Sequence, residues 1–304
     1  MPNPIWTSHV AIFLKKTLSG IVSDKEDGMD GNMVARQYMK VESMSDAYED
    51  YTSYAGPGLA SEKPEGVEIA TGEMYVGPQV RIFARTFGIR LLVTEEAIED
   101  CKYPEVIKAA KMCKRAIYNT LNVDATSVLV RAWDANYVGA DGQPLCSTTH
   151  TLPSGGSYSN TFAVPMSPSR TALIAMKSAI RKLPGLDGIV QQYLQLEKIV
   201  CPVEQESTWE MILGSTMAPE PGNFAAINVV KKWGLTVYAN PYWDNTTTNW
   251  LGFTNAEDKV LFKQRRKPRG QTWVDEAAGI MQYSCTDRHG LGWTDPRAVY
   301  GSQA

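Results

Sequence analysis

The longest regular hydrophobic pattern in the chain lies between residues 105 and 133. Apolar or small residues recur there in three- and four-residue steps, apart from one double step across the polar Asn122 and Asp124, at Val106, Ala110, Cys113, Ile117, Leu121, Val128 and Ala132. This spacing is typical of a helix that is buried along one face. Pro104 fits its first turn. A continuous helix over 105–133 would be roughly 43 Å long at about 1.5 Å per residue, so we expect it to cross a whole domain.

Shorter patterns predict the elements around this helix. Candidate caps start helices at Thr94, at Ser167 with Pro168, and at Ser207 with Glu210. The second of these helices carries its apolar face on Leu173, Met176, Ile180 and Leu183. Strand patterns occupy residues 79–93, 191–202, 235–239, 258–269 and 281–285. We therefore predict an α+β chain in which residues 166–269 form a compact unit and the C-terminal strands return to the domain of the long helix.

The segment 41–66 is unusually acidic. It contains six acids against one lysine, a local charge of −5, and few Ile, Leu or Val residues. Such a segment buries too little apolar surface to order itself. Its Tyr48, Tyr51 and Tyr54 have the large amphipathic rings that often anchor interfaces. We expect this segment to make more contacts with other chains than with its own.

Two other clusters leave alternatives open. The basic run Lys263, Arg265, Arg266, Lys267 and Arg269 could contact phosphates, bind the acidic segment of another subunit, or protect a solvated strand edge. The second cluster combines four aromatic residues with two asparagines and resembles a carbohydrate platform, but core packing explains it better, because aromatic residues usually serve cores and interfaces: Tyr242, Trp243, Trp250, Phe253, Asn245 and Asn249.

Composition argues against most catalytic chemistry. The 304 residues carry a net charge of −3, so no global field recruits nucleic acid. The three histidines, at 9, 150 and 289, are far apart, and His150 is expected to bond its own loop backbone. The acidic stretch 24–32 lacks the final glutamate of a calcium loop. Five cysteines without a C-x-x-C pair indicate free thiols. We predict no cofactor, no metal, no catalytic residues and no membrane span.

Several motifs carry a family resemblance. They are GIRLLVTEEAIED at 88–100, the long helix, the loop TLPSGGSYSN at 151–160 and the terminal GLGWTDPRAVYGS at 290–302. In this order they resemble the major capsid proteins of tailed bacteriophages, in the branch similar to the phage Mu major head subunit. The resemblance covers most of the chain, roughly Val67 to Gly301. It implies the fold named for phage Hong Kong 97.

The resemblance also implies a domain organisation. It assigns an N-terminal arm to residues 1–40, an extended β-hairpin loop to 41–78, a peripheral domain with a long spine helix to 79–165, an axial α/β domain to 166–269, and C-terminal strands that return to the peripheral domain to 270–304. Some capsids of this fold join a loop lysine to an asparagine of a neighbour. Here Lys63 lies between Glu62 and Glu65, which favour its charged and poorly nucleophilic form, so we predict a shell without cross-links.

The implied function is structural. The subunit would self-assemble into hexamers and pentamers of an icosahedral head that encloses double-stranded DNA without sequence-specific binding. Portal proteins and scaffold or decoration proteins are the expected partners, with assembly in the host cytoplasm and residence in the virion. The alternative is a soluble binding module for carbohydrate or nucleic acid. The predicted intersubunit contact residues are Tyr48, Tyr51, Tyr54, Glu62, Lys63, Arg265, Arg266, Lys267 and Arg269.

Overall fold

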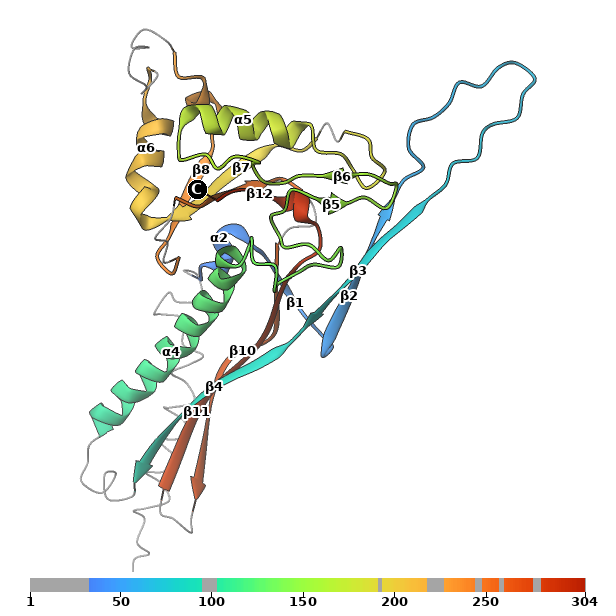
Figure 1. Ribbon diagram of the computed structural model, residues 1–304. Helices are drawn as coiled ribbons and strands as arrows, with labels where there is room; N and C mark the ends of the chain where they lie inside the picture. Colours follow the sequence, from blue (N-terminus) through green and yellow to red (C-terminus); the bar gives the residue numbers. More distant parts are fainter. Residues whose placement is uncertain are drawn as a thin grey trace, which may run out of the picture.

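The computed structural model describes residues 33–94, 103–190, 193–217, 227–243, 248–256, 260–275 and 280–303. Most of the expected N-terminal arm, the acidic stretch 24–32, the helix expected after Thr94 and Cys101 lie outside these residues. Figure 1 shows three parts: a compact α/β unit, a long sheet with a helix along it, and a hairpin that projects away from both.

The long sheet has four strands in the order β1-β10-β11-β4. Strand β1 pairs parallel with β10, and the other pairs are antiparallel. Helix α4 packs against β11 and β4 and covers one face of this sheet (Figure 1). The bounds of these elements are β1 Lys40–Ser43, β4 Arg85–Thr94, β10 Val260–Asp275, β11 Ile280–Trp293 and α4 Tyr103–Val130.

Helix α4 confirms the hydrophobic pattern, because the six predicted core positions within it are buried, as is the seventh, Ala132, just beyond its end. It ends at Val130, three residues earlier than expected. The backbone tightens there: the amide of Ala132 donates to the carbonyl of Leu129, and the Ala132 carbonyl accepts the amide of Cys146 at 2.7 Å. The last carbonyls are thus used by a turn and a distant loop instead of another helical turn.

The compact unit holds a second sheet in the order β12-β9-β7-β8, with α5 and α6 packed around it (Figure 1). A two-stranded ribbon, β5 with β6, lies beside it. The bounds are β5 His150–Thr151, β6 Ser157–Tyr158, α5 Arg170–Arg181, β7 Leu196–Pro202, α6 Glu206–Gly214, β8 Thr236–Asn240, β9 Trp250–Thr254 and β12 Val299–Ser302, with short 3-10 helices η1 Val203–Gln205, η2 Val229–Trp233 and η3 Pro296–Ala298.

Both predicted helix caps in this unit are wrong in detail. The N-cap of α5 is Ser169, whose hydroxyl accepts the amide of Ala172, so the cap lies two residues after Ser167. Helix α6 continues directly from η1, and no side chain caps it. Ser207 is therefore already helical, and it forms no capping box with Glu210. Because the preceding 3-10 turn has helical backbone angles, the chain needs no cap residue at that point.

Two strands differ from the sequence-based domain limits. Residues 260–269, expected in the axial domain, belong to β10 and pair with β1 and β11 in the long sheet. Conversely, β12 near the C-terminus pairs with β9 of the compact unit. The chain therefore crosses between the two sheets more often than a single division at residue 269 allows. Strand patterns alone do not identify the sheet in which a strand pairs.

The segment 41–78 is also not one loop. Residues 40–43 form β1 in the long sheet, and only the hairpin of β2 (Tyr48–Ala55) with β3 (Tyr75–Phe83) extends outward. The expected strand 79–93 divides at Ala84, where the chain stops pairing with β2 and begins pairing with β11. The amide of Ala84 donates to the carbonyl of Ala47 at this change of partner. Beyond the paired strands, residues 56–74 form an open loop that we call the projection.

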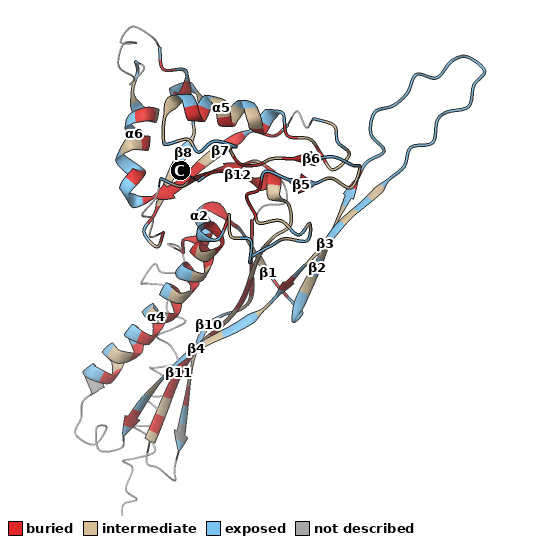
Figure 2. Cartoon of the chain, viewed as in Figure 1, coloured by how far each residue is buried: buried red, intermediate tan, exposed pale blue. Residues whose placement is uncertain are grey.

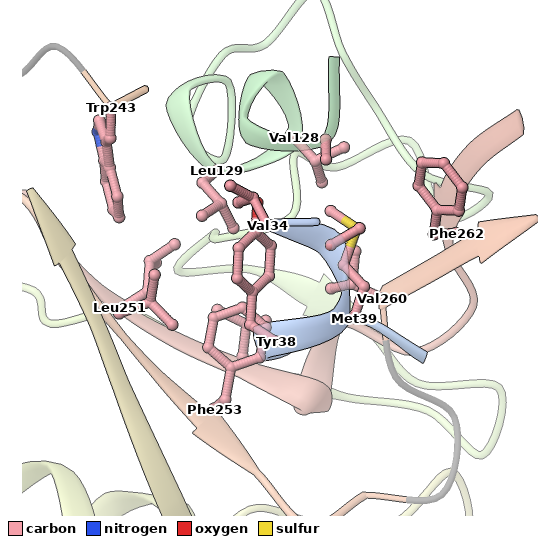
Figure 3. Close-up of a cluster of buried hydrophobic side chains, with 14 of the residues drawn as sticks. Val34, Tyr38, Met39, Val128, Leu129, Trp243, Leu251, Phe253, Val260 and Phe262 are labelled. Carbon is pink, nitrogen blue, oxygen red and sulfur yellow. The ribbon is translucent and has the colours of Figure 1, made fainter. Parts of the chain in front are cut away.

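The hydrophobic core is continuous where the two sheets meet. Figure 3 shows Val34, Tyr38 and Met39 of the α2 region packed with Val128 and Leu129 of α4. Helix α2 covers Ala35–Tyr38. Strand side chains close this cluster, namely Leu251, Phe253, Val260 and Phe262, together with Trp243. The amide of Val34 donates to Asn122 Oδ1 at 3.0 Å, so part of the polar interruption in α4 is a link to α2.

The remaining predicted core residues behave as expected. Trp243, Trp250 and Phe253 are buried, so these rings serve the core and cannot form an exposed carbohydrate platform. The four described cysteines are buried free thiols, as predicted: Cys113, Cys146, Cys201 and Cys285.

Candidate assembly surface

The projection is exposed along its whole length. Every residue from 56 to 74 is exposed, as Figure 2 shows in pale blue. Large apolar side chains are among them: Leu59 is 83% exposed, Ile69 72% and Met74 69%. Monomeric soluble proteins rarely leave so much apolar surface in one segment. The projection therefore has the character of a surface that another chain covers.

The three predicted tyrosines have different environments on β2. Tyr54, near the projection, is 65% exposed and remains available for contact. Tyr48 is half exposed, and the guanidinium of Arg81 lies 4.3 Å from its ring centroid. Tyr51 is partly buried and donates its hydroxyl hydrogen to Glu49 Oε2 at 2.7 Å. Tyr51 thus holds the root of the hairpin instead of facing outward.

A buried lysine joins this root to the long sheet. Lys263 on β10 is only 4% exposed, and its ammonium contacts Glu42 of β1 and Glu49 of β2, the latter at 3.0 Å. Its ammonium also lies 4.9 Å from the ring centroid of Tyr51. The basic run and the acidic segment therefore do meet, but the contact of Lys263 with Glu42 and Glu49 lies within one chain. Residues 40–55 belong to their own subunit for this reason.

The ion pairs shift the pKa values of this group. The hydrogen bond from Lys263, followed by that from Lys40, holds the pKa of Glu42 below its usual value. The Tyr51 hydroxyl lowers the pKa of Glu49 most strongly, and Lys263 adds to the effect. Burial by itself lowers the pKa of Lys263, but its bonds to Glu42, Tyr51 and Glu49 outweigh burial and raise it. All three groups are therefore charged at neutral pH.

The rest of the basic run lies where β10 is irregular. The register of β10 with β11 shifts between Gln264 and Arg266 and again between Arg266 and Arg269. Arg266 lies opposite Arg288, and its Nη2 donates to Thr286 Oγ1 at 3.2 Å. Arg269 pairs with Thr286, and Arg90 donates to Gln282 on the same side of β11. We call this set the basic face: Arg90, Arg266, Arg269 and Arg288.

The basic face is the side of the long sheet opposite α4. Residues of β11 that point to α4 alternate with those of the basic face, and they include the buried Tyr283 and Cys285. Several guanidinium nitrogens here are shielded from water and have no acceptor within the described residues: Arg265 Nη1, Arg266 Nε and Arg288 Nε. Burial, followed by the nearby charge of Arg269, lowers the pKa of Arg266. Lys267 is exposed beside this face.

The predicted residues of the projection lie away from these cations in the same chain. Glu62 and Lys63 are exposed in the projection, at the opposite end of the hairpin from its root on the long sheet (Figure 1). A cleft of about 410 Å³ separates the outer half of the hairpin from the compact unit, with Thr52 and Pro78 on one side and Asp187 and Arg297 on the other. The hairpin is therefore held at its root and stands off the body further out.

A second buried ionic group, which the sequence pattern did not suggest, fixes α4 to the sheet. His289 of β11 lies between the rings of Phe87 and Phe262, with centroid distances of 4.8 and 5.1 Å. Its Nδ1 is 2.6 Å from Asp287 Oδ2 and its Nε2 is 3.0 Å from Asp124 Oδ2. Burial alone lowers the pKa of His289, but the two carboxylates outweigh it and raise the pKa above 6.5.

Asp124 of this group also binds Arg85 of β4, at 2.7 Å. The polar interruption at 122–124 in α4 is therefore a pair of connections, one to α2 and one to the sheet. The clue in the sequence was an aspartate on the buried side of an amphipathic helix, because a buried carboxylate requires a partner.

A third polar group organises the terminal motif. Asn160, fully buried, donates through Nδ2 to the carbonyls of Leu145, Pro296 and Val299. Its Oδ1 lies 3.1 Å from His150 Nε2, and the other ring nitrogen of His150 lies 2.5 Å from Asp141 Oδ2. The expectation that His150 bonds its own loop backbone is therefore wrong, because both ring nitrogens contact side chains, those of Asp141 and Asn160. The motifs at 151–160 and 290–302 meet at this amide.

The described part of the chain contains no metal-binding cluster. Among residues 33–94, 103–190 and the later described ranges, no cluster of three or more His, Cys, Asp or Glu side chains could hold a metal ion. No described helix is long and apolar enough to span a membrane. The whole projection is exposed, as are Arg90 and Arg269 of the basic face.

The fold resembles solved structures whose names refer to a phage or a capsid. The Microbacterium phage Oxtober96 structure matches with a TM-score of 0.55 and 11% identity, covering 89% of this chain and 90% of that chain. The capsid of an empty GTA particle gives a TM-score of 0.52 at 15% identity and covers 89% of each chain. The procapsid of bacteriophage JBD30 gives 0.53 at 13% identity and covers 98% of this chain and 76% of that chain. These likenesses establish the Hong Kong 97-type fold.

Sequence comparison identifies the family. No curated protein sequence is significantly similar to the chain. The sequence profile of the phage capsid protein family, however, matches residues 77–302, which is most of the chain. The match includes α4, the compact unit, the terminal motif and three strands of the long sheet, β4, β10 and β11, but not β1. The chain therefore belongs to the phage capsid protein family, and it is a structural protein of a phage capsid and not an enzyme.

Proposed function

We propose that the chain is the major capsid subunit of a tailed-phage head, in the branch that resembles the phage Mu major head subunit. It assembles as homo-hexamers and homo-pentamers into an icosahedral shell around double-stranded DNA. The observation that carries this proposal is the projection, in which every residue from 56 to 74 is exposed, large apolar side chains included. A chain that works alone gains nothing from exposing this surface.

The occupant of the basic face is, in this proposal, the projection of a second copy. Residues 56–74 carry four acids and one lysine: Glu62, Glu65, Glu68, Glu73 and Lys63. The basic face supplies four arginines and guanidinium nitrogens without acceptors in the described residues. Exposed ion pairs contribute only about 0 to 1 kcal/mol each. The charges therefore set the register of the contact, and the apolar side chains of the projection provide most of its burial.

Many such contacts hold the shell. Each projection docks on one neighbouring subunit, and the rotational symmetry of the hexamer or pentamer repeats this contact around the ring. Portal proteins and scaffold or decoration proteins complete the head, and the subunit resides in the virion after assembly in the host cytoplasm. A carbohydrate-binding module is not supported, because three of the four aromatic rings that suggested it, Trp243, Trp250 and Phe253, are buried.

Removing residues 57–73 tests the proposal. The deletion spares β2, β3 and the Lys263 group, so the variant should fold with unchanged circular dichroism but remain a small species in gel filtration, while the full chain forms shells visible by electron microscopy. A deletion variant that still closes shells, or a full chain that forms only small oligomers, would contradict the proposal.

A charge test examines the occupant of the basic face. Arg265→Glu with Arg266→Glu should slow assembly most at low salt, because screening weakens the steering between the projection and the basic face. The matched Arg265→Lys with Arg266→Lys keeps the charge and should assemble at close to the native rate. Equal rates for the two double variants at low salt would rule out this docking.

A further inference from the structure

Helix α4 carries a row of cations on the face that turns away from the sheet. Lys108, Lys111 and Arg115 are exposed and follow one another at three- and four-residue steps, which places them along one side of the helix. The buried positions Val106, Ala110 and Cys113 lie on the other side. Figure 2 shows this division along α4, with buried residues toward the sheet and exposed residues opposite. We call the three cations the α4 stripe.

The charge of the α4 stripe is not neutralised within the described chain. Lys108, Lys111 and Arg115 form no ion pair with any described residue. Glu105 precedes Lys108 by three residues but forms no ion pair with it, no acid occurs from residue 106 to 123, and Asp124 is bound to His289 and Arg85 on the sheet side. Like charges three or four residues apart destabilise a helix. An ordinary solvated helix face mixes both signs and avoids this repulsion.

We propose that the α4 stripe binds the phosphate backbone of the packaged double-stranded DNA, on the lumenal side of the shell. This inference rests on the proposed capsid function. The stripe extends about 10 Å along the helix axis at about 1.5 Å per residue. A DNA strand advances about 3.4 Å per phosphate, so the stripe matches the length of roughly three phosphates. Binding to a polyanion thus explains why α4 carries three neighbouring cations whose mutual repulsion destabilises the isolated helix.

The two sides of the long sheet support this orientation. One side is the basic face, for which the chain itself offers an acidic partner, the projection of a second copy. The other side is covered by α4, and the stripe lies on the outer surface of that helix. If the projection occupies the basic face, the stripe lies on the opposite surface of the protein layer. Packaged DNA is the anionic macromolecule that a head places in bulk against one of its surfaces.

The contact should be weak and independent of DNA sequence. Each phosphate contact adds about −0.9 to the slope of the log binding constant against the log salt concentration, and each subunit supplies three such cations. Specific readout needs side chains that reach base edges within a groove, and a row of flexible cations on an exposed helix reads only the backbone. Many weak contacts over the shell surface would hold the DNA close to the wall and leave it free to slide during packaging and release.

Lysine labelling of intact particles tests the orientation. DNA-filled and DNA-free heads are treated with formaldehyde and a borane reductant, and methylation of each lysine is measured by mass spectrometry. Lys108 and Lys111 should react at least about threefold more slowly in filled heads, because paired cations at the DNA surface are withheld from the reagent. Lys267, beside the basic face, should react equally in both. Equal labelling of Lys108 and Lys111 in the two kinds of head would overturn the inference.

A binding measurement on unassembled subunits tests the stripe itself. Fluorescence anisotropy with a short DNA duplex compares the native chain with a variant carrying Lys108→Gln, Lys111→Gln and Arg115→Gln. The triple variant should lose about 2.7 from the slope of log affinity against log salt, the share of three contacts. The matched set Lys108→Arg, Lys111→Arg and Arg115→Lys should keep the native slope. A glutamine variant with the native slope would contradict the stripe as a DNA surface.

These outcomes separate the inference from the proposed function. If the full chain forms no particles, the capsid proposal fails, and the anisotropy result still decides whether the stripe binds DNA. If particles form but labelling does not differ between filled and empty heads, only the inference about α4 fails. Protection of Lys267 instead of Lys108 would place DNA on the basic face and would contradict both the orientation of the layer and the docking of the projection.

Discussion

Replacing Lys263 with methionine tests how the hairpin is held to the body. Methionine keeps an unbranched side chain of similar length but removes the ammonium that joins Glu42 of β1 to Glu49 of β2. Glu42 would keep its contact with Lys40 at 2.8 Å, whereas Glu49 would keep only the hydroxyl of Tyr51. The variant should therefore loosen the root of the hairpin and leave two carboxylates close together.

The expected loss of stability follows from the burial of the three groups. A hydrogen bond to a charged partner contributes about 1.5 to 3 kcal/mol, and breaking a buried ion pair costs about 3 to 5 kcal/mol. The glutamate side chains are 31% and 26% exposed, so water can solvate them after the change. We therefore expect Lys263→Met to lower the free energy of unfolding by about 2 kcal/mol, toward the lower end of these ranges. For a chain of this size that loss lowers Tm by roughly 4 °C.

The measurement uses urea and thermal unfolding of a variant without residues 57–73, so that assembly does not contribute. Lys267→Met is the matched control, because Lys267 is exposed in the same basic run, and it should change the stability by less than about 0.5 kcal/mol. A double-mutant cycle with Glu49→Gln isolates the pair. Equal, small losses for the Lys263 and Lys267 variants would refute the role of Lys263.

The pH dependence gives an independent readout. The pKa values of Glu42 and Glu49 are depressed in the folded chain, so their contribution is present above the ordinary glutamate pKa of about 4.3 and is lost as pH falls through the folded values. The pKa of Lys263 is raised, so its contribution is complete below the ordinary lysine value of about 10.4 and is lost as pH rises through the folded value. Lys263→Met should weaken both effects.

Three further predictions concern separate parts of the chain. His289→Leu should cost about 3 kcal/mol because it leaves Asp124 and Asp287 without their buried partner; in the native chain this contribution is complete below about pH 6.5 and is lost as pH rises through the raised folded pKa of His289. Gly252→Ala should lower Tm, because the added carbon would lie 2.4 Å from the sulfur of Met176 and 2.7 Å from a methyl of Leu196. Lys63 should form no cross-link, so denaturing gels of particles should give one band near 33.6 kDa and no ladder.

The sequence predicted those parts of the fold whose burial depends on local periodicity. In α4, every residue of the predicted apolar face is buried, and in β11 Met281, Tyr283 and Cys285 are buried as their alternation required. Such patterns succeed because one face of each element packs on the core along its whole length. The resemblance to tailed-phage capsid proteins added what periodicity could not, namely the order of the elements in one architecture.

Strand partners and buried ionic groups could not be predicted in the same way. Residues 260–269 have a strand pattern in either sheet, and only the tertiary fold places them beside β11. Lys263 has the composition of a surface residue, because its burial depends on Glu42 and Glu49, which are more than 200 positions away in the chain. His289 and Asp124 pose the same difficulty. Pairings at such separations leave no trace in local spacing.

The acidic segment 41–66 has one composition but two structural outcomes, an exposed projection and a strand region held by ion pairs. Its low content of Ile, Leu and Val predicted a segment that buries little apolar surface of its own, and in the projection every residue is exposed. In residues 40–55 the same acids are ordered by their own chain, through Lys263 and through the pair of Asp50 with Arg81 at 2.6 Å.

This division has a mechanical consequence for the subunit. The ion pairs at the root fix the direction in which the hairpin leaves the sheet, and the His289 group fixes α4 on the opposite face of the same sheet. A projection that carries no internal core can then adapt to a neighbour without disturbing either anchor. Rigidity at the root and adaptability at the end are what one chain needs if it is to occupy both hexamers and pentamers, where the angle between neighbours differs.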